Sequence, residues 1–562
     1  IDIAGGHQPM VDTERGRALA YNGEIFNYRR LRQQLTTAEQ SRLATNSDTE
    51  VLLKLVDFES FDWLERLNGM FAFAVWDSHT RRLLLARDRL GVKPLYYVDL
   101  GDELVFASEV KALLRHPRVR PKLNSKRVAE YLAFRSLVGV ETLFEGIKQV
   151  PPGHVLLAGA GIGSPRILSY WREGRERELD EYVDPGQGFV DQLEALLRDS
   201  VRERLVSDVP VGSFNSGGVD SSLVTALMKS LTQGELHTFS VGFEDPRYDE
   251  RPYAERVAER LGTRHHSLVV TECEFADAFE RALWHADEPL CHANTIQLML
   301  LSEYARQFVT VVLTGEGSDE VFGGYPRLQI PLLAEYLAWL PWPIKRGAAV
   351  VAGAAGLRRI EKLLSRSRDV REAIVTSAQL LAPAELDHLV GRVEALTERF
   401  DLLENAERRS TTGASAMLYF EQRSYLQPLL MRLDKSSMAS ALECRTPFLD
   451  YRIVEWSYKI PDSVKLRVGT DNKRIVKQVA ERHLPADIVY RAKSGFGSPL
   501  ADWLRNPRTL GRYLDVITDT TARQRGLVSA AAVDALVQEH RAGSKDHSEA
   551  LWGLINLELW HR

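Results

Sequence analysis

The segment at residues 216–222, Ser-Gly-Gly-Val-Asp-Ser-Ser, constrains the fold of this 562-residue chain more than any other. It follows the apolar residues 209–214 and runs into the apolar residues 223–228. This order predicts a strand, a tight glycine turn and the first turn of a helix. Two adjacent glycines let the backbone approach a ligand closely. The free N–H groups at the start of the following helix then form an anion site.

The polar side chains of this segment suit a phosphate ligand. Ser221 and Ser222 add hydroxyl donors, and Asp220 offers a carboxylate to the magnesium that accompanies phosphates. The Gly-Lys-Ser/Thr ending of a Walker loop is missing, so the segment resembles instead the pyrophosphate loop of enzymes that cleave ATP to AMP and pyrophosphate. The alternative is a glycine-rich turn without a ligand, which the full heptad in this context disfavours.

A second polar loop follows another predicted strand, residues 308–313. It reads Thr-Gly-Glu-Gly-Ser-Asp-Glu from Thr314 to Glu320. Three carboxylates within five residues repel one another, which indicates a compensating cation. A magnesium-bound nucleotide supplies one, whereas the alternative is an ordinary polar loop with glycine turns.

Size and charge exclude several classes of protein. A chain of 562 residues predicts at least two domains. The net charge of −5, with basic residues interspersed among acidic ones, gives no indication of nucleic-acid binding. Prolines and basic residues interrupt the apolar stretch at 332–357, which argues against a membrane span. The three cysteines suit a reducing cytosol and predict a cytoplasmic protein.

The rhythm of apolar runs changes along the chain. Up to about residue 115 the runs are short and separated by turns, as at 18–21, 70–76 and 83–86, which predicts a strand-rich domain. After residue 190 strands and helices alternate, with a strand expected at 236–241 and a helix at 253–261 that stops at Gly262. This alternation predicts a parallel sheet with ligands at the strand ends.

In chain order, these motifs resemble the glutamine-hydrolysing asparagine synthetase family over essentially the whole chain. In the second half the resemblance rests on the two loops, Glu-Cys-Arg-Thr-Pro-Phe-Leu-Asp at 443–450 and Lys-Ser-Gly-Phe-Gly at 493–497. The N-terminal part agrees independently through Asn-Gly-Glu-Ile-Phe-Asn-Tyr at 22–28, Ser-Asp-Thr-Glu at 47–50, Leu-Asn-Gly-Met-Phe-Ala at 67–72 and Ala-Arg-Asp-Arg-Leu-Gly at 86–91.

The resemblance implies two domains of different fold class. An α+β N-terminal-nucleophile glutaminase sandwich with α/β/β/α layers is expected over residues 1–165. A solvated linker follows at 166–190. An α/β parallel-sheet ATP-pyrophosphatase domain with a helical C-terminal part is expected over 191–562.

In this family an N-terminal cysteine attacks the glutamine amide, with its own α-amine as the base. This sequence opens with Ile-Asp-Ile, and none of Cys273, Cys291 and Cys444 can substitute by position. Because later glutamine-site motifs are present, we expect the true start of the chain to be missing from the sequence. A degenerate glutaminase domain is the alternative.

The remaining glutamine-site roles follow from the same resemblance. The Asn22 side chain and the Gly23 N–H would form the oxyanion hole. Glu24 and Asp48 would pair with the α-ammonium of glutamine, so that two carboxylates select the substrate without a metal.

In the second domain the resemblance implies ATP and Mg²⁺ as cofactors. Asp220 and Asp319 would be the magnesium ligands, and Lys473 would stabilise the departing pyrophosphate. Glu316 would help to form an acyl-adenylate and would deprotonate the attacking ammonia. The ATP contacts that the resemblance implies are Asn215, Ser216, Gly217, Gly218, Asp220, Ser221, Ser222, Val241, Thr314 and Gly315. At the position of Asn215 the family more often has an apolar residue, and at the position of Thr314 it more often has a serine.

The acceptor acid is where the resemblance weakens. One subgroup of asparagine makers has an arginine, aligned with Ala293 here, that clamps the α-carboxylate of aspartate. Aspartate remains the default acceptor, and Arg432 and Lys435 are candidate replacement cations. The residues expected to bind the acceptor are Glu320, Arg432 and Asp434.

Two other functions stay open at this point. One is amidation of a different carboxylate, such as a cell-wall or natural-product acid, and the other is a non-catalytic relative that binds nucleotide. The expected partners are small molecules (glutamine, ATP and a carboxylic acid), with no nucleic acid and no membrane, and a homodimer is left open.

Overall fold

The structure is a computed structural model, and it describes residues 2, 4–171, 188–329, 332–333, 339–355, 361, 364, 370–381, 383–391, 397–410, 412–467, 472–491 and 497–562. The charged run at 172–178, most of the predicted linker and residues 493–496 of the Lys-Ser-Gly-Phe-Gly motif lie outside the described residues.

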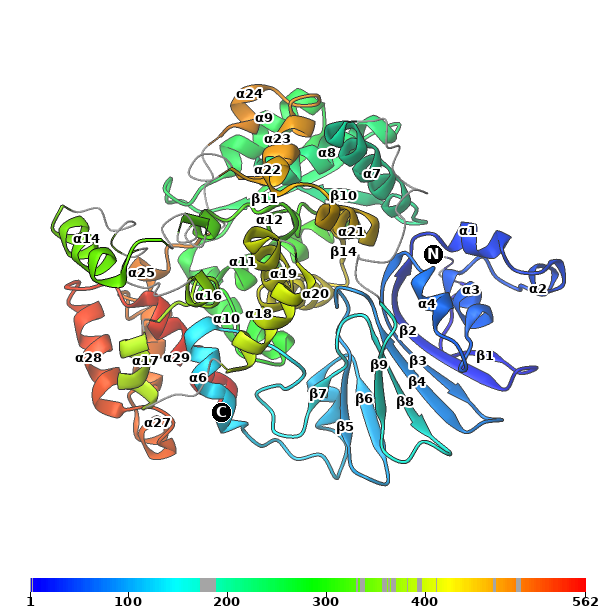
Figure 1. Cartoon of the computed structure of the whole chain (residues 1–562), viewed down its shortest axis with the longest axis horizontal. Coiled ribbons are helices and arrows are strands. Elements are labelled where there is room, and N and C mark those ends of the chain that lie inside the picture. The colour runs from blue at the N-terminus through cyan, green and yellow to red at the C-terminus, as the bar shows by residue number, and fades with distance from the viewer. Residues whose placement is uncertain are drawn as a thin grey trace.

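Two antiparallel sheets form the N-terminal domain (Figure 1). The larger sheet has the spatial order β1 (Met10–Asp12), β2 (Arg17–Ile25), β3 (Gly69–Asp77), β4 (Arg82–Arg87), β8 (His154–Gly159) and β9 (Arg166–Ser169). The smaller one has the order β6 (Leu104–Ala107), β5 (Tyr96–Asp99) and β7 (Lys148–Gln149). Because β9 pairs with β8, the larger sheet extends past the predicted domain limit at residue 165.

Strand β3 shows why the two sheets stack. Its side chains alternate between two buried faces, as expected of a strand. Phe71 and Phe73 belong to the core beneath the helices, whereas Ala72 and Ala74 face Leu85 and the smaller sheet. Small alanines on that face let the two sheets approach closely.

Helices cover both outer faces, which completes the α/β/β/α sandwich that the sequence predicts. The larger sheet is covered by α1 (Tyr28–Gln33), α3 (Asp48–Leu55) and α4 (Asp62–Glu65), and the short helix α2 (Thr37–Ser41) has no buried residue. The smaller sheet packs against α5 (Val110–Leu113) through Tyr96, Val98 and Val110.

The second domain is built on a five-stranded sheet whose neighbouring strands all run parallel. Its order is β12 (Arg264–Val269), β11 (His237–Gly242), β10 (Val211–Phe214), β13 (Val311–Leu313) and β14 (Glu443–Arg445). Ligands of such sheets bind at the carboxyl ends of the strands. Ser216, Val241 and Thr314 all lie at that edge.

Helices surround this sheet and form the C-terminal part of the chain. They are α7 (Phe189–Arg204), α8 (Val219–Leu231), α9 (Arg251–Leu261), α10 (Glu272–Ala286), α11 (Asn294–Ala305), α12 (Ser318–Phe322), η2 (Pro326–Leu328), α14 (Trp342–Ala354), α16 (Val370–Val375), α17 (Pro383–Val390), α18 (Thr397–Arg409), α19 (Gly413–Ser424), α20 (Leu426–Met438), η3 (Pro447–Leu449), α21 (Tyr451–Lys459), α22 (Asp462–Lys465), α23 (Arg474–Ala480), α24 (Ala486–Val489), α25 (Leu500–Trp503), η4 (Leu510–Arg512), α26 (Tyr513–Val516), α27 (Thr520–Arg525), α28 (Ala530–Arg541) and α29 (Ser548–His561). Helix α9 ends at Gly262 in a left-handed conformation, as predicted.

Two sequence expectations need correction. The strand expected at 308–313 begins only at Val311, because the N–H groups of Phe308 and Val309 donate to the carbonyl of Ala305 and close a helical turn.

Helix α6 (Ser125–Phe134), expected within the first domain, packs against α17 and α29 of the C-terminal part (Figure 1). Its apolar residues Val128 and Tyr131 join the core of the second domain.

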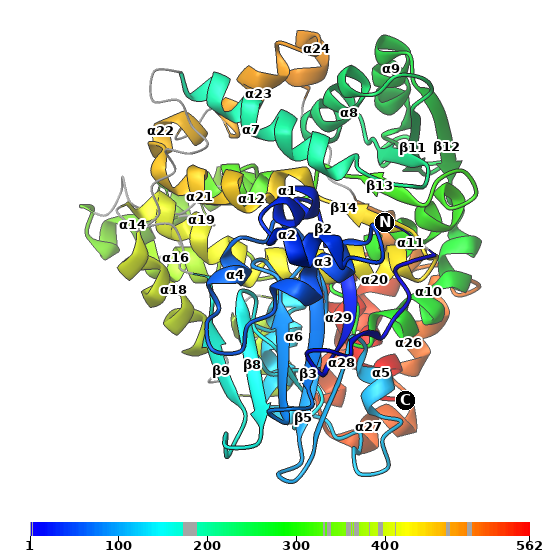
Figure 2. The same ribbon diagram turned by 90° about the vertical axis from the view of Figure 1, so that its right-hand side faces the viewer.

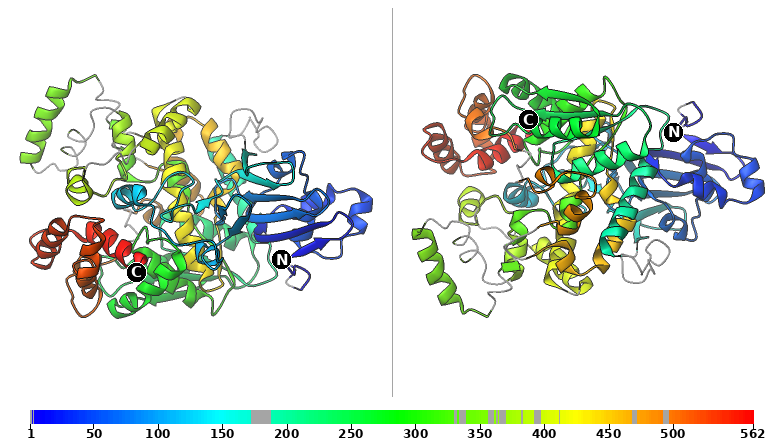
Figure 3. Two further views of the ribbon diagram at one scale, coloured as in Figure 1. Left: turned by 90° about the horizontal axis from the view of Figure 1, so that it is seen from below. Right: turned by 90° about the horizontal axis from the view of Figure 1, so that it is seen from above.

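The two domains share one buried apolar core. A single cluster runs from Phe71 in the first domain to Leu193 and Leu449 in the second. Helix α20 contacts β14 of the second domain (Figure 2). It also reaches the first domain, where the Gln427 amide donates to the carbonyl of Leu90. Figure 3 shows the blue strands of the N-terminal domain at one end of the molecule and the red C-terminal helices at the other. Within the described part of the chain, no helix has the length and apolar character to cross a membrane.

Candidate active sites

The loop after β10 has the geometry of an anion site. Gly217 adopts φ +70°, a left-handed conformation that favours glycine. The Gly217 N–H donates to Oδ1 of Asn215 (3.0 Å), and the Ser216 N–H donates to Oγ of Ser221 (3.2 Å). Helix α8 starts directly after Gly218, so its positive end points toward the strand ends.

This loop lines a cavity of about 830 Å³ at the carboxyl ends of the parallel strands. The cavity brings together most of the site residues predicted in this domain, namely Asn215, Ser216, Gly218, Asp220, Ser221, Val241, Thr314, Gly315, Glu316, Asp319, Glu320, Arg432 and Lys473. Gly217 and Ser222 face the protein interior instead, and the Ser222 hydroxyl donates to Oδ1 of Asn215. These two residues shape the loop from behind.

Lys473 joins the two predicted magnesium ligands. Its Nζ lies 2.8 Å from Oδ1 of Asp319 and also contacts Oδ2 of Asp220. Burial alone would lower the pKa of Lys473, but the two carboxylates outweigh this and raise it, so the side chain stays charged. The Ser318 hydroxyl holds the other oxygen of Asp220 at 2.7 Å.

The same arrangement fits a magnesium ion. Two carboxylates from different loops converge on one ammonium group, so a cation fits between them, and oxygen ligands suit Mg²⁺. No group of three or more histidine, cysteine or acidic residues is placed to hold a metal ion among the described residues. Phosphate oxygens of a bound nucleotide would complete the coordination of this ion.

The opposite wall of the cavity carries Glu316 and Arg432. The guanidinium of Arg432 lies 3.1 Å from Oε1 of Glu316 and donates to Asn294 at 2.8 Å. Glu320 is 1% exposed and accepts the hydroxyl of Tyr325 at 2.5 Å. Burial and the neighbouring acids raise the pKa of Glu320 to about 8, so it is mostly protonated at neutral pH.

Two of the residues considered for the acceptor lie elsewhere. Asp434 points to the first domain and pairs with Lys93 at 2.7 Å, both side chains being buried. Lys435 pairs with Asp287 at 2.6 Å. Helix periodicity explains the direction of Asp434, which lies about 200° around α20 from Arg432. Lys435 lies within about 60° of Arg432 and is held away from the acceptor position by its ion pair with Asp287.

The predicted glutamine-site residues gather at the end of β2. Gly23 has φ +147°, and a Cβ there would overlap the carbonyl oxygen of Met70 on β3. Only glycine therefore fits at this position. Asp48 starts α3, where one of its carboxylate oxygens accepts the Tyr21 hydroxyl and the Ile25 N–H, each at 2.9 Å.

Glu24 and Asp48 form a buried acidic pair beside Asn22 and Gly23. Glu24 is 4% exposed and Asp48 is 3% exposed. Burial and the adjacent Asp48 raise the pKa of Glu24 to about 8. Burial also raises the pKa of Asp48, despite the hydrogen bonds that it accepts from Ile25 and Tyr21. A cationic ligand such as an α-ammonium would relieve this excess of carboxylate charge.

Two family models match consecutive parts of the chain. The model of the asparagine synthase family matches residues 192–562, and that of the glutamine amidotransferase domain matches residues 1–171. The chain belongs to the asparagine synthase family. It is an asparagine-synthetase-type glutamine amidotransferase and a glutamine-dependent ligase.

Three relatives illustrate the range of this family. Glutamine-hydrolysing asparagine synthetase 1 of Bacillus subtilis is 30% identical over 566 residues, covering 100% of this chain and 88% of that protein. Asparagine synthetase 3 of the same organism is 32% identical over 536 residues, covering 91% and 81%. The amidase chyE of Penicillium rubens is 27% identical over 586 residues, covering 96% and 85%.

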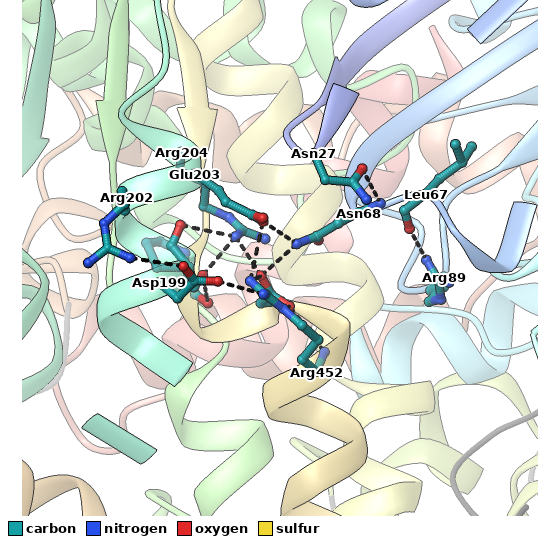
Figure 4. Close-up of polar contacts among 12 residues, drawn as sticks. Asn27, Leu67, Asn68, Arg89, Asp199, Arg202, Glu203, Arg204 and Arg452 are labelled. Carbon is teal, nitrogen blue, oxygen red and sulfur yellow. Dashed lines mark hydrogen bonds and ion pairs between the residues drawn. The ribbon is translucent and has the colours of Figure 1, made fainter. Parts of the chain in front are cut away.

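A buried polar network joins the glutaminase and synthetase domains (Figure 4). The Asn68 amide, which precedes β3, donates to Glu203 at 2.6 Å and to Asp450 at 2.9 Å. Arg204 and Arg452 contact the same Asp450 carboxylate at 3.0 and 2.8 Å. Asn68 and Asp450 both belong to motifs that carried the family resemblance, but neither motif revealed that the two residues meet.

Sequence reasoning missed an aromatic wall of the synthetase cavity. Tyr325 and Tyr425 meet edge to face at 5.4 Å, and the Arg327 guanidinium lies 4.1 Å from each ring centre. His292 approaches the Tyr425 hydroxyl at 3.1 Å, and burial lowers its pKa well below the usual range, so it is neutral. No local pattern signals this wall, because its members come from three separate segments of the chain, at His292, at Tyr325 with Arg327, and at Tyr425.

Proposed function

We propose that this synthetase adenylates a carboxylic acid with ATP and amidates it with ammonia released from glutamine. Aspartate is the first acceptor to test. The observation that carries the proposal is one cavity in which Lys473 bridges Asp220 and Asp319 while Arg432 holds Glu316. A separate cluster with two buried carboxyl groups, Glu24 and Asp48, suits the α-ammonium of glutamine.

The first reaction joins the acid to AMP. A carboxylate oxygen attacks the α-phosphorus of ATP, and the bond to the β-phosphate oxygen breaks. Lys473 and the N–H groups at the start of α8 stabilise the charge that develops on the departing pyrophosphate. Asp220 and Asp319 would hold the Mg²⁺, which neutralises phosphate charge when bound.

The second reaction forms the amide. Ammonia attacks the acyl carbon of the adenylate, and AMP leaves with the former carboxylate oxygen. Glu316 accepts the proton from the attacking nitrogen. Arg432, at 3.1 Å from this carboxylate, keeps Glu316 oriented toward the cavity.

Ammonia comes from the glutaminase domain. Asn22 and the Gly23 N–H form the oxyanion hole for the glutamine amide, and Glu24 and Asp48 bind the α-ammonium.

The three free cysteines in the chain support a reducing, cytoplasmic location.

A second candidate acceptor is a larger acid. Arg432, the arginine beside Glu316, is already engaged by Glu316 and Asn294, and Ala293 offers no cation for the α-carboxylate of aspartate. A buried carboxylate without a cationic partner is costly, which favours an acid with a blocked or absent α-carboxylate.

The deciding experiment for the acceptor is a screen of carboxylic acids at saturating ATP and ammonium salt, with pyrophosphate release as the signal. Strong preference for free aspartate establishes an asparagine synthetase. Comparable or faster turnover of larger acids establishes a specialised amidotransferase. Failure of every acid to release pyrophosphate would contradict the proposed chemistry.

A further inference from the structure

An arginine of the synthetase domain reaches the glutamine pocket. Arg445 ends β14, yet its Nη2 lies 3.6 Å from Oε2 of Glu24 on β2 of the glutaminase domain. The two side chains are 2% and 5% exposed, so the ion pair is buried inside the domain interface. Arg445 belongs to the Glu-Cys-Arg-Thr-Pro-Phe-Leu-Asp motif, whose place in the sequence says nothing about glutamine.

The rest of the Arg445 guanidinium is fixed by its own domain. Its Nε contacts Glu443 at 2.6 Å, and its Nη1 donates to the carbonyls of Arg204 and Val206, each at 2.7 Å. A planar guanidinium held at two nitrogens has little freedom to rotate, so Nη2 stays directed at Glu24.

The charges around Glu24 explain why a cation is needed there. Asp48 from α3 and Glu443 from β14 both add negative charge, and the Tyr21 hydroxyl is engaged by Asp48. Burial and Asp48 already raise the pKa of Glu24 to about 8, and Arg445 opposes this rise. Removing the guanidinium would therefore leave Glu24 protonated over a wider pH range.

We propose that Arg445 is a positioning residue for glutamine, contributed to the glutaminase site by the synthetase domain. It opposes the rise in the pKa of Glu24 and orients this side chain, so that Glu24 can ionise when the α-ammonium of the substrate binds. The inference rests on the proposed binding roles of Glu24 and Asp48. It also means that the glutamine site is complete only when the two domains are docked.

The same residue touches the nucleotide loop. The carbonyl of Arg445 accepts the N–H of Thr314 at 2.9 Å, at the point where β13 leads into the loop that carries Glu316. The side chain of Arg445 thus contacts the carboxylate of Glu24, the proposed glutamine-binding residue. Its backbone contacts the loop that lines the ATP cavity. A side-chain substitution leaves the backbone contact in place, so the two effects can be separated.

The test compares Arg445→Met with Arg445→Lys in the full-length protein. Glutamine affinity is measured by isothermal titration calorimetry between pH 6.5 and 8.5, and synthesis from ammonium salt is measured in parallel. In the unmodified protein, affinity should rise with pH as Glu24 loses its proton near pH 8. Arg445→Met should weaken binding at pH 7 by about ten- to a hundredfold and move this rise to higher pH.

Two variants separate this role from simple packing. Arg445→Lys keeps a positive charge and should recover most of the affinity and the original pH dependence. Arg204→Met removes another buried arginine of the same interface, which stacks on Phe26 at 4.4 Å but pairs with Asp450 rather than Glu24. It should lower thermal stability while leaving the pH dependence of glutamine binding in place.

The outcomes also separate this inference from the proposed function. If Asp48→Ala loses glutamine affinity while Arg445→Met binds normally, the positioning role is wrong and the glutamine site stands. Equal weakening by Met and Lys with an unshifted pH dependence would also overturn it, as a packing effect. If Asp48→Ala binds glutamine normally, the glutamine-site assignment itself fails.

Discussion

The glutamine pocket and the synthetase cavity differ in how they balance charge. In the glutamine pocket, Glu24 and Asp48 are buried together, and the pKa of Glu24 is raised to about 8. In the synthetase cavity, carboxylates are matched by protein cations, as Lys473 is with Asp220 and Asp319. At the first site, burial and the neighbouring acid keep the pKa of Glu24 high even beside Arg445, so a small cation would help both carboxyl groups to ionise. The second has paired charges that a magnesium nucleotide can replace, so the balance itself indicates the ligand.

The largest expected effect separates the two sites from the synthetase side. Lys473→Ala removes the cation that bridges two carboxylates and that we propose stabilises the leaving pyrophosphate. Pyrophosphate release should fall by about a hundred- to a thousandfold. Glutamate formation should remain largely intact, and measuring both products in one assay checks this.

Lys229→Ala is the matched control, because this partly exposed lysine in the last turn of α8 donates to the carbonyl of Gly234. It should leave both products unchanged. Equal loss of glutamate and pyrophosphate in a correctly folded Lys473→Ala protein would contradict the separation of the two sites.

A smaller effect is expected from the glutamine side. Asp48→Ala removes one charge-assisted contact to the α-ammonium, worth roughly 1.5–3 kcal/mol. The KM for glutamine should rise about ten- to a hundredfold, while synthesis from ammonium salt stays near normal. Asp62→Ala, at an exposed position of α4, is the control. A parallel fall in ammonium-driven synthesis would make Asp48 a structural residue.

Substitution at the interface between the two domains should mainly lower the free energy of unfolding. Asn68→Ala removes an amide that donates to both Glu203 and Asp450. Leaving these buried acceptors with fewer donors should cost about 1–3 kcal/mol of folding free energy, seen as a lower midpoint in thermal unfolding. Unchanged stability would show that Arg204 and Arg452 satisfy the network without Asn68.

The smallest effect is expected at Glu320. Because its pKa is raised to about 8, this side chain is mostly a neutral acid at pH 7, and Glu320→Gln preserves both shape and charge. Synthesis at pH 7 should change by no more than about threefold. A loss of a hundredfold would show that Glu320 acts as a carboxylate.

The sequence predicted the local strands, turns and helices of both sites, but it did not predict the contacts between the two domains. Strand β10, the glycine turn and α8 follow from an apolar run, two glycines and a periodic helix, all within 25 residues. The contact of Arg445 with Glu24 joins residues more than 400 positions apart, and no periodicity reports such a contact. The sequence did not predict that α6 packs on the synthetase domain, for the same reason.

Candidate contacts within one helix showed a different limit. Arg432, Asp434 and Lys435 share one basic and acidic cluster in the sequence. Asp434 is turned about 200° from Arg432 around α20 and pairs with Lys93, whereas Lys435 lies within about 60° of Arg432 but pairs with Asp287. Composition placed the cluster near the site, but only the packing of α20 could sort its members.

Transfer of an oxygen label tests the central claim most directly. An acceptor acid labelled with ¹⁸O in its reacting carboxylate is incubated with ATP and ammonium salt, which removes any need for the glutamine site. Because the carboxylate oxygen attacks the α-phosphorus, one labelled oxygen should appear in AMP and none in pyrophosphate. Label in pyrophosphate or in orthophosphate, or unlabelled AMP formed together with the amide, would contradict adenylation of the acid.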